Sequence, residues 1–353
     1  MKKLVSIFTI SILLFGCKKS TENSQEPLSR IAFGSCCEQF IADKSIYSRI
    51  LEKNPQLYIA GGDNIYGDFF ALAPGTPDYI QGAYNQLAGD AYWKTFRASV
   101  PIIATWDDHD TGDNDGTSTG PVIGVAKDLF FKFWDIPADA PRHNRPDGGI
   151  YDACYYGDDA HRVQIILLDL RWNHTPYKET QRPALNHDTL MSPDATMLGA
   201  AQWAWLEAEL KKPAKVRIIM SSLQFNCFYN GGENWAVLPL EKQKMLDLIK
   251  STGANGLFFI SGDVHFAEFT KTQPAGMYPI YEFTSSGISH HEDRVPNTND
   301  AIRIGDGWQY VNFGLLTIDW NVSPVTIKAE IFGNTTPLDA KVSHTVTLDE
   351  LKF

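Results

Sequence analysis

Short, continuous apolar runs recur along most of the chain, and they constrain its fold more than any other feature. Runs of this length and composition are typical of strands buried on both faces of a sheet. They span residues 31–33, 57–60, 102–105, 163–168, 216–220, 257–260 and 281–284. Amphipathic helical patterns lie between them, most clearly at 197–210 and 245–249. The alternation of strands with helices predicts an α/β architecture.

A polar cluster follows nearly every one of these runs. The segments after the first six runs are Gly-Ser-Cys-Cys (34–37), Gly-Gly-Asp-Asn-Ile-Tyr (61–66), Trp-Asp-Asp-His-Asp (106–110), Asp-Leu-Arg (169–171), Ser-Ser-Leu-Gln (221–224) and Ser-Gly-Asp-Val-His (261–265). Open α/β sheets carry their functional sites at the carboxyl ends of the strands. Six such clusters therefore predict one site built from the ends of several strands.

The rest of the chain extends this domain. Residues 111–149 are rich in Gly, Pro and Asp, and we expect them to form loops around a cleft. Residues 315–318, 325–331 and 344–348 have β character and are expected to extend a sheet. The sequence has no sign of a second domain boundary, so we expect one domain over 30–353.

The N-terminus has the features of an export signal. Lys2 and Lys3 precede an apolar run over 4–15, which is shorter than the roughly 20 residues that span a bilayer. The run ends in Leu-Phe-Gly-Cys, which resembles a bacterial lipobox with Cys17 as the lipidated residue. We expect a lipoprotein signal peptide (1–16), a polar tether (17–29) and an envelope protein anchored to the membrane on its periplasmic or surface side. A plain signal peptide cut near Gly16 is the alternative.

The net charge bears on the possible binding partners, and the cysteines bear on the possible metal ligands. A formal net charge of −11 is a poor match to nucleic acid, which requires clustered cations, so no nucleic-acid partner is expected. If Cys17 is acylated, four cysteines remain. A bridge between the adjacent Cys36 and Cys37 would be strained. A thiol at the end of the first strand is then better explained as a metal ligand.

The residue types in the clusters are those of a metal centre. Carboxylates, imidazoles, a thiol and a phenol occur at Asp63, Asp108, Asp110, Asp263, His109, His265, Cys36 and Tyr66. Two cations about 3.5–4 Å apart require a bridging carboxylate and flanking ligands of these kinds. A phenolate and a thiolate suit a trivalent or borderline ion such as Fe³⁺, whereas carboxylates and amides suit a harder ion such as Ca²⁺.

The order of the motifs resembles the alkaline phosphatase D (PhoD-like) family of metallophosphatases. Gly62-Asp63-X-X-Tyr66 is similar to the G-D-x-x-Y element, and Asp107–Asp110 to the G-N-H-E/D element with aspartate for asparagine. Residues 262–265 are similar to G-H-x-H, with Asp263 in place of the first histidine. The similarity runs from about Arg30 to Trp320. It implies a metallophosphoesterase-like sandwich of two mixed β-sheets flanked by helices (αββα), with a C-terminal β extension.

The resemblance also implies a role for each matching residue. Cys36, Tyr66 and His265 would bind one ion, Fe³⁺, and Asp63 would bridge. Asp108 and Asp263 would bind the second ion, Ca²⁺, although other divalent metals are also compatible. His109 would lie beside the phosphate and stabilise charge or protonate the leaving oxygen. A metal-activated water would attack phosphorus in line.

Several assignments stay open on the sequence alone. Cys37 competes with Cys36 as the thiol ligand, although the Phe-Gly-Ser-Cys register favours Cys36. The resemblance implies a further asparagine or backbone ligand between the third and last motifs, whose position stays open, with Gln224 and Asn226 as candidates. Arg171 either clamps the phosphate with its planar fork or pairs with a buried carboxylate.

Two other polar segments are ambiguous. Residues 113–116 (Asp-Asn-Asp-Gly) match part of a calcium loop but lack the spacing of an EF-hand, so a polar turn at the cleft rim is the favoured interpretation. His290 and His291 either approach the cleft or lie on the surface.

The expected activity is hydrolysis of small-molecule or lipid phosphate esters, as in an alkaline phosphatase or phosphodiesterase. One alternative is a phospholipase-like phosphodiesterase. Another is a catalytically silent, calcium-dependent binding protein of the envelope. The presence of His109 together with Cys36 and His265 disfavours the silent protein, because calcium binding requires none of these side chains.

Overall fold

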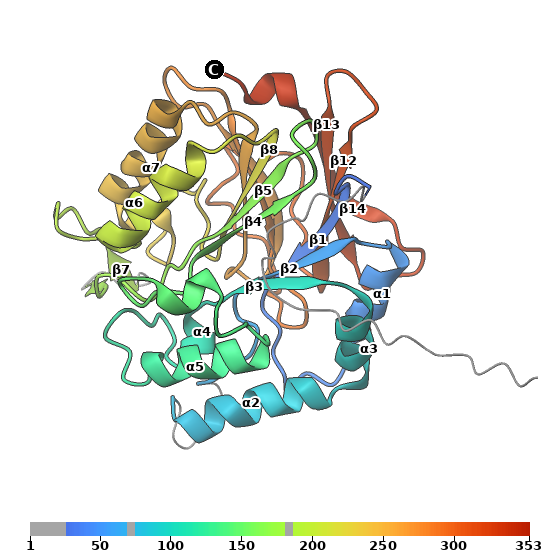
Figure 1. Cartoon of the computed structure of the whole chain (residues 1–353). Coiled ribbons are helices and arrows are strands. Elements are labelled where there is room, and N and C mark those ends of the chain that lie inside the picture. Colours follow the sequence, from blue (N-terminus) through green and yellow to red (C-terminus); the bar gives the residue numbers. More distant parts are fainter. Residues whose placement is uncertain (1–25, 69–74, 181–185) are drawn as a thin grey trace, which may run out of the picture.

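Two six-stranded mixed sheets pack face to face, and helices cover their outer faces (Figure 1). The computed structural model describes residues 26–68, 75–180 and 186–353. The predicted signal peptide, Cys17 and most of the tether therefore lie outside the described residues. Within the described ranges, no helix is both long and apolar enough to cross a bilayer. The expected αββα sandwich is confirmed.

The first sheet combines the N-terminal and C-terminal parts of the chain. Its strand order is β14-β13-β12-β1-β2-β3, with β1, β2 and β3 parallel and β12 antiparallel to β1. The bounds are β1 (Arg30–Gly34), β2 (Leu57–Gly61), β3 (Ile102–Thr105), β12 (Asn312–Asp319), β13 (Thr326–Gly333) and β14 (Ala340–Thr347). The predicted C-terminal β extension is thus confirmed as the antiparallel half of this sheet.

The second sheet has the order β10-β11-β9-β8-β5-β4, in which β5, β8, β9 and β11 are parallel. Its strands are β4 (Asp152–Tyr156), β5 (Val163–Leu167), β8 (Val216–Ser221), β9 (Leu257–Ser261), β10 (Ala267–Thr272) and β11 (Ile280–Ser285). The two antiparallel edge strands, β4 and β10, were not predicted. Both mix polar with apolar residues and end partly exposed, so neither carries the continuous apolar run of a central strand.

Helices cover the outer face of each sheet. Those at the first sheet are α1 (Ile46–Glu52), α2 (Pro77–Gly89), α3 (Ala91–Ser99) and α5 (Ile123–Phe133), and those at the second are α6 (Gly199–Leu210) and α7 (Pro239–Thr252). Helix α5 lies inside 111–149, which was expected to be loops, so that expectation is wrong for this stretch. Ala126, Phe130 and Phe131 bury one face of α5, and the Gly- and Pro-rich composition belongs to its flanks.

The central strands of the first sheet separate two hydrophobic cores, which explains their continuous apolar runs. Ile31 and Phe33 of β1 pack into the core between the sheets, which continues beneath α6 and α7. Ala32, between them, packs into the second core under α1, α2, α3 and α5. Because successive side chains of a strand point to opposite faces, all three positions from Ile31 to Phe33 must be apolar.

Candidate metal centre

The polar segments predicted to form one site converge between the carboxyl ends of β1, β2, β3 and β9. Four of the predicted ligands adopt the left-handed backbone conformation, with φ of 61° at Cys36, 48° at Asp63, 70° at Asp263 and 59° at His265. Residues other than glycine rarely adopt this conformation, and such strain tends to cluster at functional sites. The conformation occurs at four of the predicted ligand positions, which indicates that these four turns belong to one functional site.

Close approach of the β2 and β3 turns depends on Gly62. Its φ is 103°, and a Cβ at this position would lie 2.7 Å from the Cβ of Asp107. Only glycine fits without displacing the neighbouring turn. Gly62 therefore allows Asp63 to lie beside the carboxylates that follow β3.

One group of possible ligands joins the two sheets. Atoms of Cys36, Asp63 and His265 that can bind a metal lie within 4.8 Å of one another. The Cys36 Sγ is 3.3 Å from Asp63 Oδ2. The Tyr66 hydroxyl is 3.0 Å from His265 Nε2 and 3.5 Å from Asp63 Oδ2. The structure thus brings together the four residues predicted around the first ion.

Two further groups continue from the first: the second shares Asp63 with the first, and the third shares Asp108 with the second. Asp63, Asp108 and His109 form one, and Asp107, Asp108 and Asp263 form the other, again with possible ligand atoms within 4.8 Å. The short helix α4 (Asp108–Thr111) starts directly after β3 and carries Asp108 and His109. Asp63 belongs to two of these groups, which is the position expected of a bridging carboxylate.

The burial of these carboxylates and their mutual repulsion favour the binding of cations among them. Asp63 Oδ1, Asp107 Oδ2 and Asp108 Oδ1 are buried and have no hydrogen-bond partner. Burial, together with the nearby Cys36 and Asp108, raises the pKa of Asp63 well above its usual value. Burial likewise raises the pKa of Cys36 to about 12. Buried carboxylates this close together are costly without compensating charge, and cations among them supply it. The residues present therefore fit a metal centre.

His109 is held by a carboxylate that the sequence analysis missed. Its Nδ1 lies 2.7 Å from Asp68 Oδ1, and its ring packs against that of Tyr66, with centroids 4.1 Å apart and planes tilted by 32°. Burial alone would lower the pKa of His109, but Asp108 and the bond to Asp68 raise it to about 9. The contact with Asp68 at Nδ1 thus orients the His109 ring.

Arg171 pairs with buried carboxylates, which is the second of the two roles that the sequence left open. Its side chain is fully buried, and its Nε donates to Asp107. Both terminal nitrogens donate to Glu233, at 2.7 Å each, and Nη2 lies 3.5 Å from Asp108 Oδ1. Because its three guanidinium nitrogens donate to Asp107 and Glu233, Arg171 balances the negative charge of the acidic cluster instead of clamping a phosphate. Glu233 was not predicted.

Three other candidates serve the surrounding structure. Asp110 accepts hydrogen bonds from the backbone nitrogens of Asn64 and Asp107, so it caps the turn. Gln224 donates to Glu268 and Thr284, and Asn226 donates to the carbonyl of Ile280. Among the described residues, Asp110 belongs to no group of His, Cys, Asp and Glu side chains that could hold a metal.

The polar turn at 113–116 lies close to the centre. The Asp115 backbone nitrogen donates to Asp108 Oδ2 at 2.8 Å, and the Asp115 side chain is 2.6 Å from His187 Nε2. Asp115, His187 and Glu233 form a further group with possible ligand atoms within 4.8 Å. Glu233 is already bound by Arg171, whose positive charge opposes a cation at this position. The turn therefore helps to orient Asp108.

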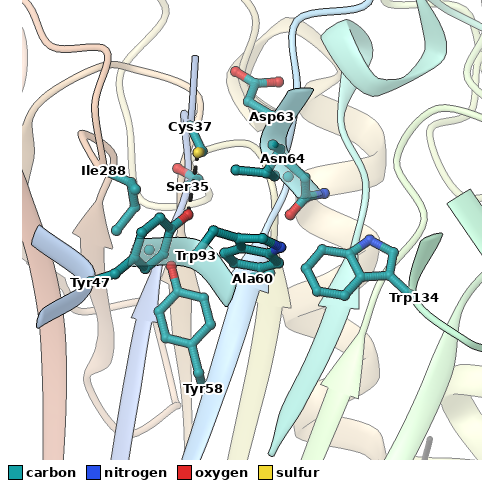
Figure 2. A pocket seen from close by; sticks show the side chains of 13 residues that line it. Ser35, Cys37, Tyr47, Tyr58, Ala60, Asp63, Asn64, Trp93, Trp134 and Ile288 are labelled. Atoms are coloured by element: carbon teal, nitrogen blue, oxygen red, sulfur yellow. Dashed lines mark hydrogen bonds between the residues drawn. The ribbon is translucent and has the colours of Figure 1, made fainter. Parts of the chain in front are cut away.

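The two adjacent cysteines face different surroundings. Cys36 contacts Asp63, whereas the Tyr47 hydroxyl donates to the Cys37 Sγ at 3.2 Å. Figure 2 shows Cys37 and Tyr47 in a pocket that also contains Trp93 and Trp134. Both thiols are free and buried. Of the two, Cys36 is the one placed among the possible metal ligands.

The sequence of this chain is similar to those of known proteins. A model of the PhoD-like phosphatase family matches residues 31–309. Alkaline phosphatase D of Bacillus subtilis (strain 168) is 23% identical over 258 residues, covering 68% of this chain and 42% of that protein. The chain thus matches less than half of the length of this curated relative.

Two solved structures share the fold. A structure of PhoD aligns with a TM-score of 0.76 and 19% identity, over 93% of this chain and 71% of that chain. The structure of GAP50, the anchor in the inner membrane complex of Plasmodium, aligns with a TM-score of 0.56 and 12% identity, over 91% and 89% of the two chains. At these identities the likeness establishes the architecture.

Proposed function

This chain belongs to the PhoD-like phosphatase family, and from that premise we propose that it hydrolyses phosphate esters at a binuclear or larger metal centre. The observation that carries the proposal is the sharing of Asp63 between two groups of possible metal ligands. A carboxylate shared in this way is the arrangement that two adjacent cations require.

The proposed ligands divide between two ions. Cys36, Tyr66 and His265 hold the first, Asp63 bridges, and Asp108 and Asp263 hold the second. Bound cations supply an acidified water as the nucleophile and positive charge for the phosphate oxygens.

The remaining groups of the site act on the substrate and on the ligands. His109, held by Asp68, contacts the phosphate and stabilises charge or protonates the leaving oxygen. Arg171 does not reach the substrate in this scheme; it orients Asp107 and Asp108.

Turnover of two model substrates tests the proposed activity. We expect the metal-loaded protein to hydrolyse p-nitrophenyl phosphate, its bis-ester, or both, as measured by release of p-nitrophenol. A preference for the bis-ester would support the phospholipase-like phosphodiesterase, and lipid phosphate esters would then be assayed directly. No turnover of either ester with both metal sites loaded would contradict the enzyme and leave the silent calcium-binding protein.

We propose Fe³⁺ at the Cys36–Tyr66–His265 position and Ca²⁺ at the second. The thiolate and the phenolate are electron-rich anions that suit a trivalent or borderline ion, and the carboxylates suit a harder one. Protein purified without chelators is expected to contain iron and to be coloured by ligand-to-metal charge transfer, measured by metal analysis and visible absorption. A colourless, fully active protein that holds only zinc would rule out the iron assignment.

We also propose that the protein is a lipoprotein of the bacterial envelope. Residues 1–16 would be the signal peptide, 17–29 the tether and 30–353 the phosphatase domain, with the lipid on Cys17 and the domain on the periplasmic or surface side. Cys17→Ser is expected to abolish incorporation of labelled fatty acid and to leave unprocessed precursor. Unchanged incorporation in this variant would contradict the anchor, and a processed but unlabelled wild type would indicate a plain signal peptide.

A further inference from the structure

The connection from β11 to β12 begins with residues 286–292. This segment contacts both Cys36 and His265, which belong to the first group of possible ligands. Ser286 forms a parallel bridge with Ser35, at the end of β1 in the other sheet. The backbone nitrogens of Ser289 and His290 both donate to the carbonyl of Cys36, at 3.1 Å each. We call residues 286–292 the strap.

The strap binds His265 as well as Cys36. The Ser286 hydroxyl accepts a hydrogen bond from the His265 backbone nitrogen at 2.8 Å and lies 3.1 Å from the Cys36 Sγ. At the other end of the strap, the Glu292 nitrogen donates to the His265 carbonyl at 2.8 Å. The backbone of His265 is thus held on both sides.

His290, in the middle of the strap, contacts the His265 side chain directly. The two rings are stacked, with centroids 3.9 Å apart and planes 27° from parallel. The His290 Nδ1 lies 3.5 Å from a carboxylate oxygen of Glu38, which is buried. The ring is also 5.2 Å from that of Tyr66. The contact with Glu38 therefore holds the His290 ring in place, and the His290 ring in turn holds the ring of His265.

The location of these contacts matters because Cys36 follows a strand of the first sheet and His265 a strand of the second. Their separation depends on how the sheets pack, whereas a metal site tolerates deviations of only about 0.5 Å. Hydrogen bonds within either sheet cannot fix a distance between the sheets. The strap bonds to both residues and can fix it.

We infer that His290 is a positioning residue that, with the strap, holds the His265 ring and Cys36 in register for one cation. The inference rests on the proposed metal centre and assigns His290 no contact with the metal. Partners behind a metal ligand typically contribute 10–100-fold to metal affinity. Because the role is stacking, an aromatic ring without nitrogen should fulfil it.

Titration of metal-stripped, full-length protein with Co²⁺ alone tests this role, because thiolate-to-cobalt absorption reports binding at Cys36. His290→Ala is expected to weaken this binding about 10-fold or more, and His290→Phe to restore it to within about threefold of wild type. His291→Ala is the matched control: this neighbour is partly buried, its ring centroid lies 6.1 Å from that of Tyr310, and wild-type affinity is expected.

Wild-type Co²⁺ affinity in His290→Ala would overturn the inference, and so would an equal loss of affinity in the Ala and Phe variants. Loss of one bound ion in both variants would also overturn it, because His290 would then be a ligand. Ser286→Ala, which removes the bonds to His265 and Cys36, provides the same test if His290→Ala fails to fold by circular dichroism. A wild type that binds Co²⁺ without hydrolysing esters would contradict the phosphatase activity and leave the strap inference standing.

Discussion

Asp63→Asn is expected to lose bound metal and turnover together. Asp63 belongs to two of the possible ligand groups, so the substitution removes one negative charge from both ions. Replacing a residue behind a ligand already costs about 10–100-fold in affinity or activity, and a shared ligand should cost at least about 100-fold. Metal content by elemental analysis and kcat/KM for p-nitrophenyl phosphate measure the two losses on the same preparation.

Asp152→Asn is a matched control for the loss of a buried carboxylate. Asp152 lies on the edge strand β4 and pairs with Arg145, and neither residue belongs to a possible metal-binding group among the described residues. The control should keep its metal and its rate. If Asp63→Asn also keeps both, Asp63 is not a bridging ligand.

Most of the fold was predictable because its central strands are buried on both faces. The run at 31–33 is a clear case, since alternate residues of β1 pack into different cores and all must be apolar. The edge strand β10 was missed because its last residues, the exposed Lys271 and the partly exposed Thr272, interrupt the pattern. Helix α5 was missed because glycine and proline at its flanks dominate the composition of the segment.

The candidate site was predictable only where its residues follow strands. Cys36, Asp63, Asp108 and Asp263 occupy strand ends, and parallel strands bring those ends to one edge. Residues that reach the site only through contacts between distant parts of the chain leave no pattern in the sequence around them. Asp68 is 41 residues from the histidine that it holds, and the other missed partner, Glu233, is 62 residues from Arg171.

The role of the strap was hidden for a related reason. The sequence placed His290 either near the cleft or on the surface, because a histidine after a turn is compatible with both. Its stacking on His265 depends on how β11 passes to β12 across the two sheets. The spacing of residues along the chain does not encode that path.

His109→Ala is expected to lower kcat by about 10²–10⁴ while metal content stays near stoichiometric. His109 Nδ1 contacts Asp68, and the carboxylates of Asp108 and Asp68 raise the pKa of His109, which favours the protonated ring. A protonated imidazole beside a phosphate stabilises negative charge and can donate to the leaving oxygen. Asp68→Asn, which weakens the hold on the ring, should reduce kcat in the same direction by a smaller factor.

The leaving group separates the two ways in which His109 can act. If it donates a proton, the loss in His109→Ala should be smaller for p-nitrophenyl phosphate than for an alkyl phosphate, because p-nitrophenolate leaves without protonation. Equal losses for both esters would favour charge stabilisation. Loss of metal would show that His109 is a ligand, an arrangement that its grouping with Asp63 and Asp108 permits. Full activity on alkyl phosphates with both ions retained would remove His109 from the mechanism.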